Sequence, residues 1–133
     1  MAGVVADTHA LVWYLIDSPR ISGRARGVLA GAIASGYPVF VSAISLIEVI
    51  YLGEKGRIPA DDVSRFQGAT RRPDRGIAVV PIDMAIVGAL GQIARTAVPD
   101  LPDRIIAATA LHLGVPLISR DGRIRASGLE TIW

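Results

Sequence analysis

The chain has 133 residues, of which 51% are hydrophobic and 20% are charged. This balance excludes a disordered chain, and the length suits one packed domain spanning residues 1–133. The sequence contains no cysteine, which excludes disulfide bonds, thiolate nucleophiles and cysteine metal ligands. With 14 basic and 12 acidic residues the formal charge is +2, which permits a polyanionic partner without requiring one.

The hydrophobic pattern predicts strands that alternate with helices. In chain order we expect a strand at residues 2–6, helices at 8–15 and 22–35, a strand at 39–41, helices at 43–53 and 59–72, a strand at 77–82, helices at 83–97 and 105–114, a strand at 115–119 and a short edge strand at 131–133. Ser22, Ser42 or Ser45, and Asp83 are the expected helix caps. Such alternation implies a mostly parallel sheet covered on both faces, so the predicted class is α/β.

Residues 28–53 form an apolar stretch in which Glu48 is the only charged residue. Gly36, Tyr37 and Pro38 interrupt it, which predicts a turn between two buried segments rather than a membrane span. The first residues also lack the basic region and cleavage site of a secretory signal. We therefore expect a cytoplasmic protein with no membrane partner.

Two aspartates lie where predicted strands end. Asp7 follows the first strand directly, and Asp121 comes two residues after the strand at 115–119. Because parallel strands end at the same edge of a sheet, where ligands bind, both carboxylates are expected there. Capping of the following helix or turn is the alternative for each, and for Asp121 it is the favoured interpretation.

Glu48 lies in an apolar helical segment with no Lys or Arg within four residues. The helix is expected to be largely buried, and a buried carboxylate without a partner is strongly disfavoured. Glu48 therefore needs a cation, a hydrogen bond or a proton. The alternative is a side chain that reaches solvent from the end of the helix.

Asp100 and Asp103 stand at the start of a predicted helix. Asp100 suits the cap, and Asp103 suits the first turn, where the helix dipole favours an anion. Asp103 also shares a helical face with Ile106 and Ala110, the face expected to pack on the sheet. Its carboxylate is therefore predicted to point inward at the rim of the sheet.

Asp7, Glu48, Asp103 and Asp121, with Asp100 nearby, are thus expected to form one acidic cluster. Carboxylates this close repel one another, so they need a divalent cation or must stay partly protonated. Ligands that are all oxygen suit Mg²⁺ or Mn²⁺. The chemistry that fits this site is metal-assisted hydrolysis of a phosphodiester by an activated water molecule.

Four segments follow one another along the chain: VADTHALVWYL, VSAISLIEV, DLPDRIIAATA and LISRDGRI. Together they resemble the PIN-domain ribonucleases and, more narrowly, the VapC toxins of bacterial toxin–antitoxin pairs. The resemblance covers essentially the whole chain. It implies a three-layer α/β/α sandwich with a central, mostly parallel sheet, and an endoribonuclease that depends on Mg²⁺ or Mn²⁺.

The resemblance also assigns the acidic residues. The metal-binding and catalytic positions of the family fall on Asp7, Glu48, Asp103 and Asp121. Asp100 matches a further acid of the family, in a segment where Leu101 and Pro102 depart from the usual DPFDR order.

Contacts with substrate are expected from hydroxyl and basic side chains. Thr8 falls where the family often has a hydroxyl that contacts a metal-bound water, and Arg120 and Arg123 lie beside Asp121, where they can meet phosphates. His9 is expected to support the site rather than bind the metal. Trp13 is expected in the core or an interface rather than as a reader of bases.

The partners that the resemblance implies are an RNA substrate and a small VapB-type antitoxin. In such pairs the antitoxin lays a segment across a groove of the toxin and pushes a basic side chain into the acidic site. The weakly charged helices at 23–35 and 43–53 are expected to supply this groove and a homodimer face. With both faces occupied, toxin and antitoxin would form a hetero-oligomer.

Other proteins with an acidic sheet edge fit less well. A haloacid dehalogenase-type enzyme needs a second Asp where His9 stands, and a receiver domain needs a Lys after a late strand, whereas the only Lys is Lys55. No GxGxxG motif follows the first strand. The alternative that stays open is a PIN-like module that binds RNA or protein without cleaving.

Overall fold

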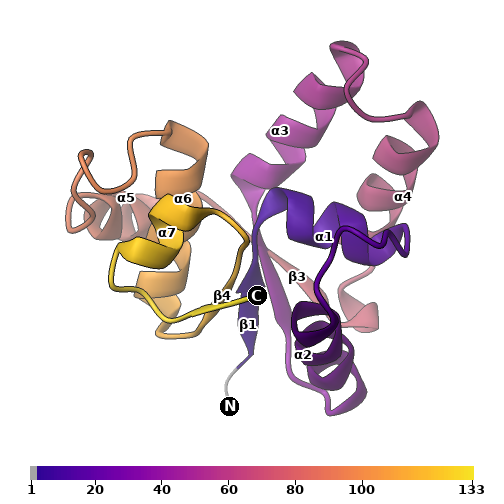
Figure 1. The fold of residues 1–133 in the computed structure, drawn as a ribbon, viewed down its shortest axis with the longest axis horizontal. Helices are drawn as coiled ribbons and strands as arrows, with labels where there is room; N and C mark the ends of the chain where they lie inside the picture. Colours follow the sequence, from indigo (N-terminus) through magenta and orange to yellow (C-terminus); the bar gives the residue numbers. More distant parts are fainter. Residues whose placement is uncertain (1–2) are drawn as a thin grey trace.

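In the computed structural model, which describes residues 3–133, strands and helices alternate along the chain (Figure 1). The strands are β1 (Val4–Ala6), β2 (Val39–Ser42), β3 (Ile77–Val80), β4 (Leu117–Ile118) and β5 (Thr131–Ile132). The helices are α1 (Thr8–Leu15), α2 (Gly23–Ala34), α3 (Ala43–Glu54), α4 (Ala60–Thr70), α5 (Met84–Leu90), α6 (Leu101–Leu113) and α7 (Gly122–Ala126), with a short 3₁₀ turn η1 (Pro73–Arg75).

The five strands form one sheet in the order β3-β2-β1-β4-β5, and each neighbouring pair is parallel. β1 lies in the centre, where Val5 pairs with Phe40 on one side and Leu117 on the other. The final strand lies at an edge, as predicted. The α/β class with a parallel sheet is confirmed, and the chain leaves the middle of the sheet at Asp7.

Helices cover both faces of the sheet and form an apolar core on each (Figure 1). One core contains Leu11 of α1, Leu29 of α2 and Phe66 of α4, and the other contains Ile86 of α5, Ile106 of α6 and Ile124 of α7. Burial of these side chains from both sides stabilises a three-layer arrangement. The predicted α/β/α sandwich is therefore confirmed.

Three helix starts follow from the predicted caps. The side chains of Ser22, Ser42 and Asp83 accept hydrogen bonds from the first-turn amides of α2, α3 and α5 respectively. Of the two serines proposed for α3, Ser42 is the cap, because Ser45 lies inside the helix and is fully buried. These caps fix where α2, α3 and α5 leave the loops before them.

The helix predicted at residues 83–97 ends earlier, at Leu90, and turns follow it. Its buried residues continue beyond the helix with Ile93 and Val98, so the apolar spacing mimicked a longer helix. The side chain of Arg104 on α6 donates to the carbonyls of Leu90 and Ile93 at 3.1 and 2.8 Å. These bonds fasten the segment after α5 to helix α6.

Two further expectations about the elements need correction or limitation. α7 was not predicted, because its five residues are too few to show helical periodicity. The first predicted strand began at residue 2, which lies outside the described residues; within them β1 begins at Val4.

The apolar stretch at residues 28–53 divides into the end of α2, strand β2 and most of α3, as predicted. Helix α3 is not largely buried, which contradicts the expectation, because Ile47, Ile50 and Tyr51 are 47%, 44% and 57% exposed. The apolar character of α3 marks an exposed face as well as a core face. Within residues 3–133, no helix is both long and apolar enough to cross a membrane.

Candidate active site

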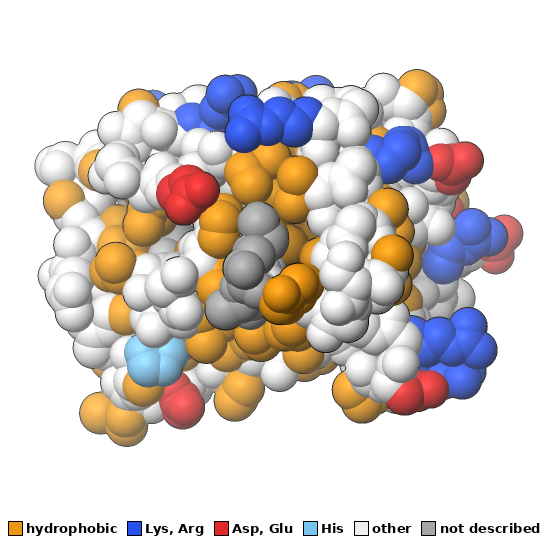
Figure 2. Space-filling view, turned by 90° about the horizontal axis from the view of Figure 1, so that it is seen from below, with side chains coloured by type: hydrophobic (Ala, Val, Ile, Leu, Met, Phe, Trp, Pro, Cys, Tyr) orange, Lys and Arg blue, Asp and Glu red, His pale blue; other side chains and the backbone are white. Residues whose placement is uncertain are grey.

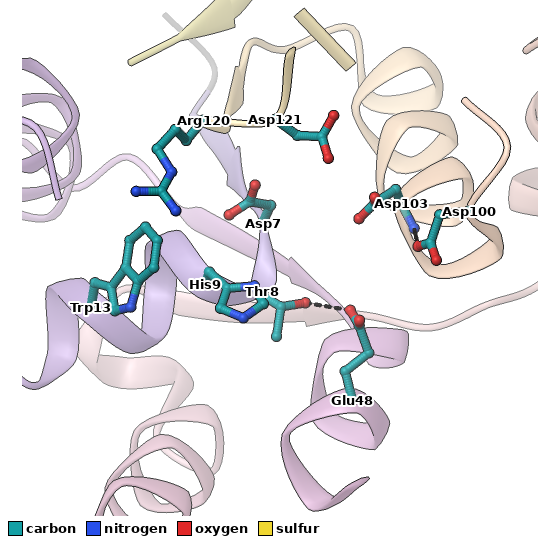
Figure 3. Close-up of a pocket in the computed structure, with 9 residues that line it drawn as sticks. All are labelled: Asp7, Thr8, His9, Trp13, Glu48, Asp100, Asp103, Arg120 and Asp121. Carbon is teal, nitrogen blue, oxygen red and sulfur yellow. Dashed lines mark hydrogen bonds between the residues drawn. The ribbon is translucent and has the colours of Figure 1, made fainter. Parts of the chain in front are cut away.

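A pocket of about 360 Å³ lies at the edge of the sheet where β1 and β4 end (Figure 3). The nine residues that line it are Asp7, Thr8, His9, Trp13, Glu48, Asp100, Asp103, Arg120 and Asp121. All five acidic residues singled out in the sequence are among them, together with Thr8 and Arg120. Arg123 does not line this pocket, although it stands on the same α7 segment as Asp121.

The carboxylates reach the pocket from four parts of the chain. Asp7 follows β1, Asp121 precedes α7, Glu48 projects from α3, and Asp103 lies in the first turn of α6 beside Asp100 (Figure 3). β1 and β4 are adjacent and parallel, which explains why Asp7 and Asp121 meet at one edge. The inward direction predicted for Asp103 agrees with its place in the pocket wall.

Three of these aspartates are also helix caps. Asp7 accepts from the amide of Ala10, Asp121 from those of Arg123 and Ile124, and Asp100 from that of Asp103. In each case one carboxylate oxygen makes the cap, which leaves a second oxygen for another partner. The capping and cluster interpretations of Asp7 and Asp121 are therefore compatible, because the helix starts orient the side chains that line the pocket.

Glu48 has a hydrogen-bond partner that its own helix could not reveal. The hydroxyl oxygen of Thr8, which is buried, lies 2.6 Å from Glu48 Oε1 and 2.8 Å from Ser45 Oγ. A hydroxyl has one proton and a carboxylate only accepts, so Thr8 donates to Glu48 and accepts from Ser45. This chain of hydroxyls holds Glu48 against α1, and its side chain is half-buried in the pocket wall rather than extended into solvent.

Burial raises the pKa of three carboxyl groups in the pocket, those of Asp7, Glu48 and Asp103. For Asp7 the loss of hydration is the largest cause, opposed by hydrogen bonds from Ser119 and from the amide of Ala10. For Glu48 the loss of hydration is again the largest cause and raises the pKa, while the Thr8 hydroxyl lowers it. Asp7 and Glu48 are therefore harder to ionise than ordinary carboxyls.

Asp103 shows the strongest effect of its neighbours. Loss of hydration, followed by the negative charges of Asp100, Asp121, Glu48 and Asp7, raises its pKa to about 7. Like charges in one pocket make the last ionisation costly. A pocket with this property has a clear electrostatic preference for a cation.

The donor set fits a hard divalent cation in type, since the pocket offers carboxylate oxygens and no sulfur ligand. Within residues 3–133, however, no three His, Asp or Glu side chains converge closely enough to hold one ion as they stand. The carboxylates surround the pocket instead of meeting at its centre (Figure 3). Coordination of one ion by several of them requires rotation of side chains toward the centre.

Sequence reasoning missed one member of the pocket wall. Trp13 is 7% exposed and belongs to a core cluster, as expected, but it also lines the pocket. The guanidinium carbon of Arg120 lies 4.6 Å from the centre of its ring. The sequence could have predicted Trp13 beside the site, because it lies four residues after His9 and so shares its face of α1.

Within residues 3–133, two other hollows and the face opposite the pocket (Figure 2) show no comparable gathering of acidic side chains. On the opposite face, seen from below in Figure 2, acidic side chains are scattered among apolar and basic ones. Two other hollows, one beside Tyr37 and one beside Tyr14, contain a single carboxylate between them, that of Asp74. The pocket at the ends of β1 and β4 is therefore the candidate active site.

Residues 4–128 match the family model described as the PIN domain. The chain belongs to the PIN-domain family. The match includes every residue of the acidic pocket. It ends at residue 128, before the edge strand β5. The resemblance seen in the four sequence segments is thereby confirmed, and it supports a nuclease.

Known relatives of this PIN domain point to one group within the family. It is 30% identical over 128 residues to Ribonuclease VapC22 from Mycobacterium tuberculosis, a match that covers 95% of this chain and 92% of the relative. Among solved structures it is similar to VapBC2 from Rickettsia felis bound to a promoter DNA fragment, with a TM-score of 0.73, 15% identity and coverage of 98% and 97%. It is also similar to DNA-bound VapBC from Salmonella typhimurium, with a TM-score of 0.73, 22% identity and coverage of 99% and 98%.

Proposed function

We propose that this PIN domain is an endoribonuclease that hydrolyses RNA with the help of Mg²⁺ or Mn²⁺. The observation that carries the proposal is the meeting of Asp7, Glu48, Asp103 and Asp121, with Asp100 beside them, in one pocket at the carboxyl edge of the sheet. The 30% identity to a VapC ribonuclease across nearly the whole chain supports the same activity.

The acidic residues have the role of holding the cation. Asp7, Asp103 and Asp121 are the ligands we propose, with Glu48 completing the set and Asp100 available at the rim. A bound Mg²⁺ or Mn²⁺ lowers the pKa of a water molecule and offsets the negative charge that develops at the phosphate. Burial raises the pKa values of Asp7, Glu48 and Asp103, and a positive charge in the pocket would favour their ionised forms.

The remaining side chains orient these acids and the substrate. Thr8 holds Glu48 in place through its hydroxyl, and the helix caps made by Asp7 and Asp121 fix the direction of their carboxylates. Arg120 lines the pocket wall, and we assign it to an RNA phosphate. Arg123 is exposed in the first turn of α7, and we assign it to RNA phosphates outside the pocket.

We further propose that the protein is the toxin of a toxin–antitoxin pair. Two of the solved structures it resembles are VapBC complexes bound to DNA, from Rickettsia felis and Salmonella typhimurium. A small VapB-type antitoxin is the expected partner, in a hetero-oligomer that also contains a homodimer of this chain. The exposed apolar residues of α3, Ile47, Ile50 and Tyr51, supply surface for these contacts.

The alternative function is a PIN-like module that binds RNA or protein without cleavage. Loss of one or more acids would favour it, but all four acids implied by the resemblance are present and line one pocket. We therefore favour the nuclease.

Cleavage of a labelled single-stranded RNA by the purified chain tests the proposal. We expect cleavage with Mg²⁺ or Mn²⁺ and none with EDTA. Asp7→Asn should abolish it without unfolding the protein, because an asparagine oxygen can still cap α1 at the Ala10 amide. Glu130→Gln, which removes an equal charge from an exposed position outside the pocket, should cleave like the parent. Full activity of Asp7→Asn, or cleavage in EDTA, would overturn the assignment.

A test in cells addresses the toxin role separately. Expression of the chain in bacteria should arrest growth, and co-expression of the product of an adjacent upstream gene should relieve the arrest. The Asp7→Asn variant should not arrest growth. Growth unaffected by an active nuclease would contradict the toxin role while leaving the activity intact.

A further inference from the structure

Arg120 lines the acidic pocket without pairing with any of its acids. Five carboxylates share the pocket wall with it, yet within residues 3–133 Arg120 forms no ion pair. Its guanidinium instead lies over the ring of Trp13, 4.6 Å from the ring centre (Figure 3). The face of an aromatic ring attracts a cation, so Trp13 provides Arg120 with a partner other than the carboxylates.

The Trp13 ring is held firmly enough to act as such a support. It is 7% exposed and belongs to the apolar core that contains Leu11 and Leu29. The rings of Trp133 and Trp13 meet edge to face, with 6.0 Å between their centres. The centre of the His9 ring, on the same face of α1, lies 5.6 Å from that of Trp13. The side chain of Trp13 therefore has little freedom to move away from Arg120.

The position over Trp13 leaves the hydrogen-bond donors of the guanidinium uncommitted to the carboxylates. A cation–π contact uses no acceptor of the carboxylates, and the fork of N–H groups of an arginine matches two oxygens of a phosphate. If Arg120 turned to the carboxylates, its N–H groups would form hydrogen bonds with them and would not be free for a phosphate. Its positive charge would also lie where the metal ion is expected. The position over the Trp13 ring avoids both effects.

We propose that Trp13 is a positioning residue that holds the Arg120 guanidinium on the pocket wall, away from the carboxylates, where its N–H groups bind a phosphate of the RNA. This inference rests on the proposed function, because it concerns the substrate of the same pocket. It assigns a role to Trp13 that its burial alone does not require.

Binding of RNA without cleavage tests the first half of the proposal. Fluorescence anisotropy of a labelled single-stranded RNA is measured in the Asp7→Asn background with Mg²⁺ at several salt concentrations. Adding Arg120→Gln should weaken binding about 3- to 10-fold. The slope of log Kd against log salt concentration should fall by about 0.7, the value for one phosphate contact on a single strand. Arg57→Gln, an equal charge change in the exposed segment between α3 and α4, should leave both quantities close to those of the parent.

The second half concerns the coupling between Trp13 and Arg120. Trp13→Leu should weaken binding nearly as much as Arg120→Gln, and the double variant should bind no more weakly than Arg120→Gln alone. Trp13→Phe keeps an aromatic face and should recover most of the affinity, which protects the test if Trp13→Leu fails to fold. Additive losses from the two single variants, or equal weakening by Trp13→Phe and Trp13→Leu, would overturn the positioning role.

These outcomes separate the inference from the proposed function. If the chain cleaves RNA but Arg120→Gln binds as tightly as its parent, the inference fails and the nuclease assignment stands. If Arg120 and Trp13 are coupled in binding but the chain with Asp7 intact never cleaves RNA, the nuclease assignment fails and the pair still recognises phosphate.

Discussion

The Thr8 hydroxyl donates a hydrogen bond to Glu48 at 2.6 Å, joining the first turn of α1 to the middle of α3 across 40 positions of the sequence. This contact explains how an apolar helix tolerates a half-buried glutamate with no basic residue near it in sequence. It also couples two residues of the candidate site, since both side chains line the same pocket.

Thr8→Val should impair the site and the fold together. The substitution keeps the shape of the side chain but removes the proton donated to Glu48 and the acceptor used by Ser45, at a cost of about 1–3 kcal/mol in the free energy of unfolding. Because the Thr8 hydroxyl lowers the pKa of Glu48, its loss should move the pH midpoint of RNA cleavage upward. Thr8→Ser restores the hydroxyl and should behave like the parent in both denaturant titration and the pH profile; an unshifted profile in Thr8→Val would count against this role.

Asp103 should make the metal-free protein less stable as the pH rises. Its pKa is raised from 3.8 to about 7 in the folded state, so the folded chain binds this proton more tightly than the unfolded chain. The contribution is fully present below pH 3.8 and is lost as the pH rises through about 7. Melting temperatures in EDTA between pH 4 and 8, measured for the parent and Asp103→Asn, should show the variant gaining on the parent with rising pH. A constant difference between the two across this range would show that Asp103 does not titrate there.

Divalent cations should stabilise the folded chain. A ligand that binds only the folded state adds about 2.7 kcal/mol at a concentration of one hundred times Kd. Mg²⁺ or Mn²⁺ should therefore raise the melting temperature of the parent and of Glu130→Gln, and should raise it much less in Asp7→Asn and Asp103→Asn. Equal shifts in all four proteins would indicate that the ion binds elsewhere.

Arg104 should matter for stability although it does not line the pocket. Its side chain bonds to the carbonyls of Leu90 and Ile93, which ties the segment after α5 to the helix that carries Asp103. Arg104→Met leaves these carbonyls without that partner and should cost about 1–3 kcal/mol. Hydrogen exchange should show faster opening of residues 91–100 than in the parent. Unchanged exchange in this segment, despite lower stability, would place the effect elsewhere.

Much of the fold was predictable because its signals are local. The spacing of apolar residues gives most strands and helices, and Ser22, Ser42 and Asp83 mark helix starts by their side-chain chemistry. The same local signal failed after Leu90, where Ile93 continues the apolar spacing but packs from a turn. It also failed for α3, whose apolar side chains Ile47 and Ile50 face outward.

The acids of the pocket could be chosen from the sequence, but their surroundings could not. Asp7 and Asp121 follow from the rule that parallel strands end at one edge, and Glu48 from the absence of a basic partner. The bond from Thr8 to Glu48 and the cation–π contact of Arg120 with Trp13 join residues far apart in sequence, and only the packed structure brings them together.

Restoration of activity by metal is the most direct test of the central claim that the acidic pocket supports metal-dependent RNA cleavage. The purified chain is treated with EDTA, dialysed, and mixed with labelled RNA while Mg²⁺ is added stepwise, with Asp103→Asn in parallel. We predict no cleavage before addition, saturable recovery in the parent, and no recovery in Asp103→Asn. Cleavage of equal rate before and after Mg²⁺, or equal recovery in the variant, would contradict the claim.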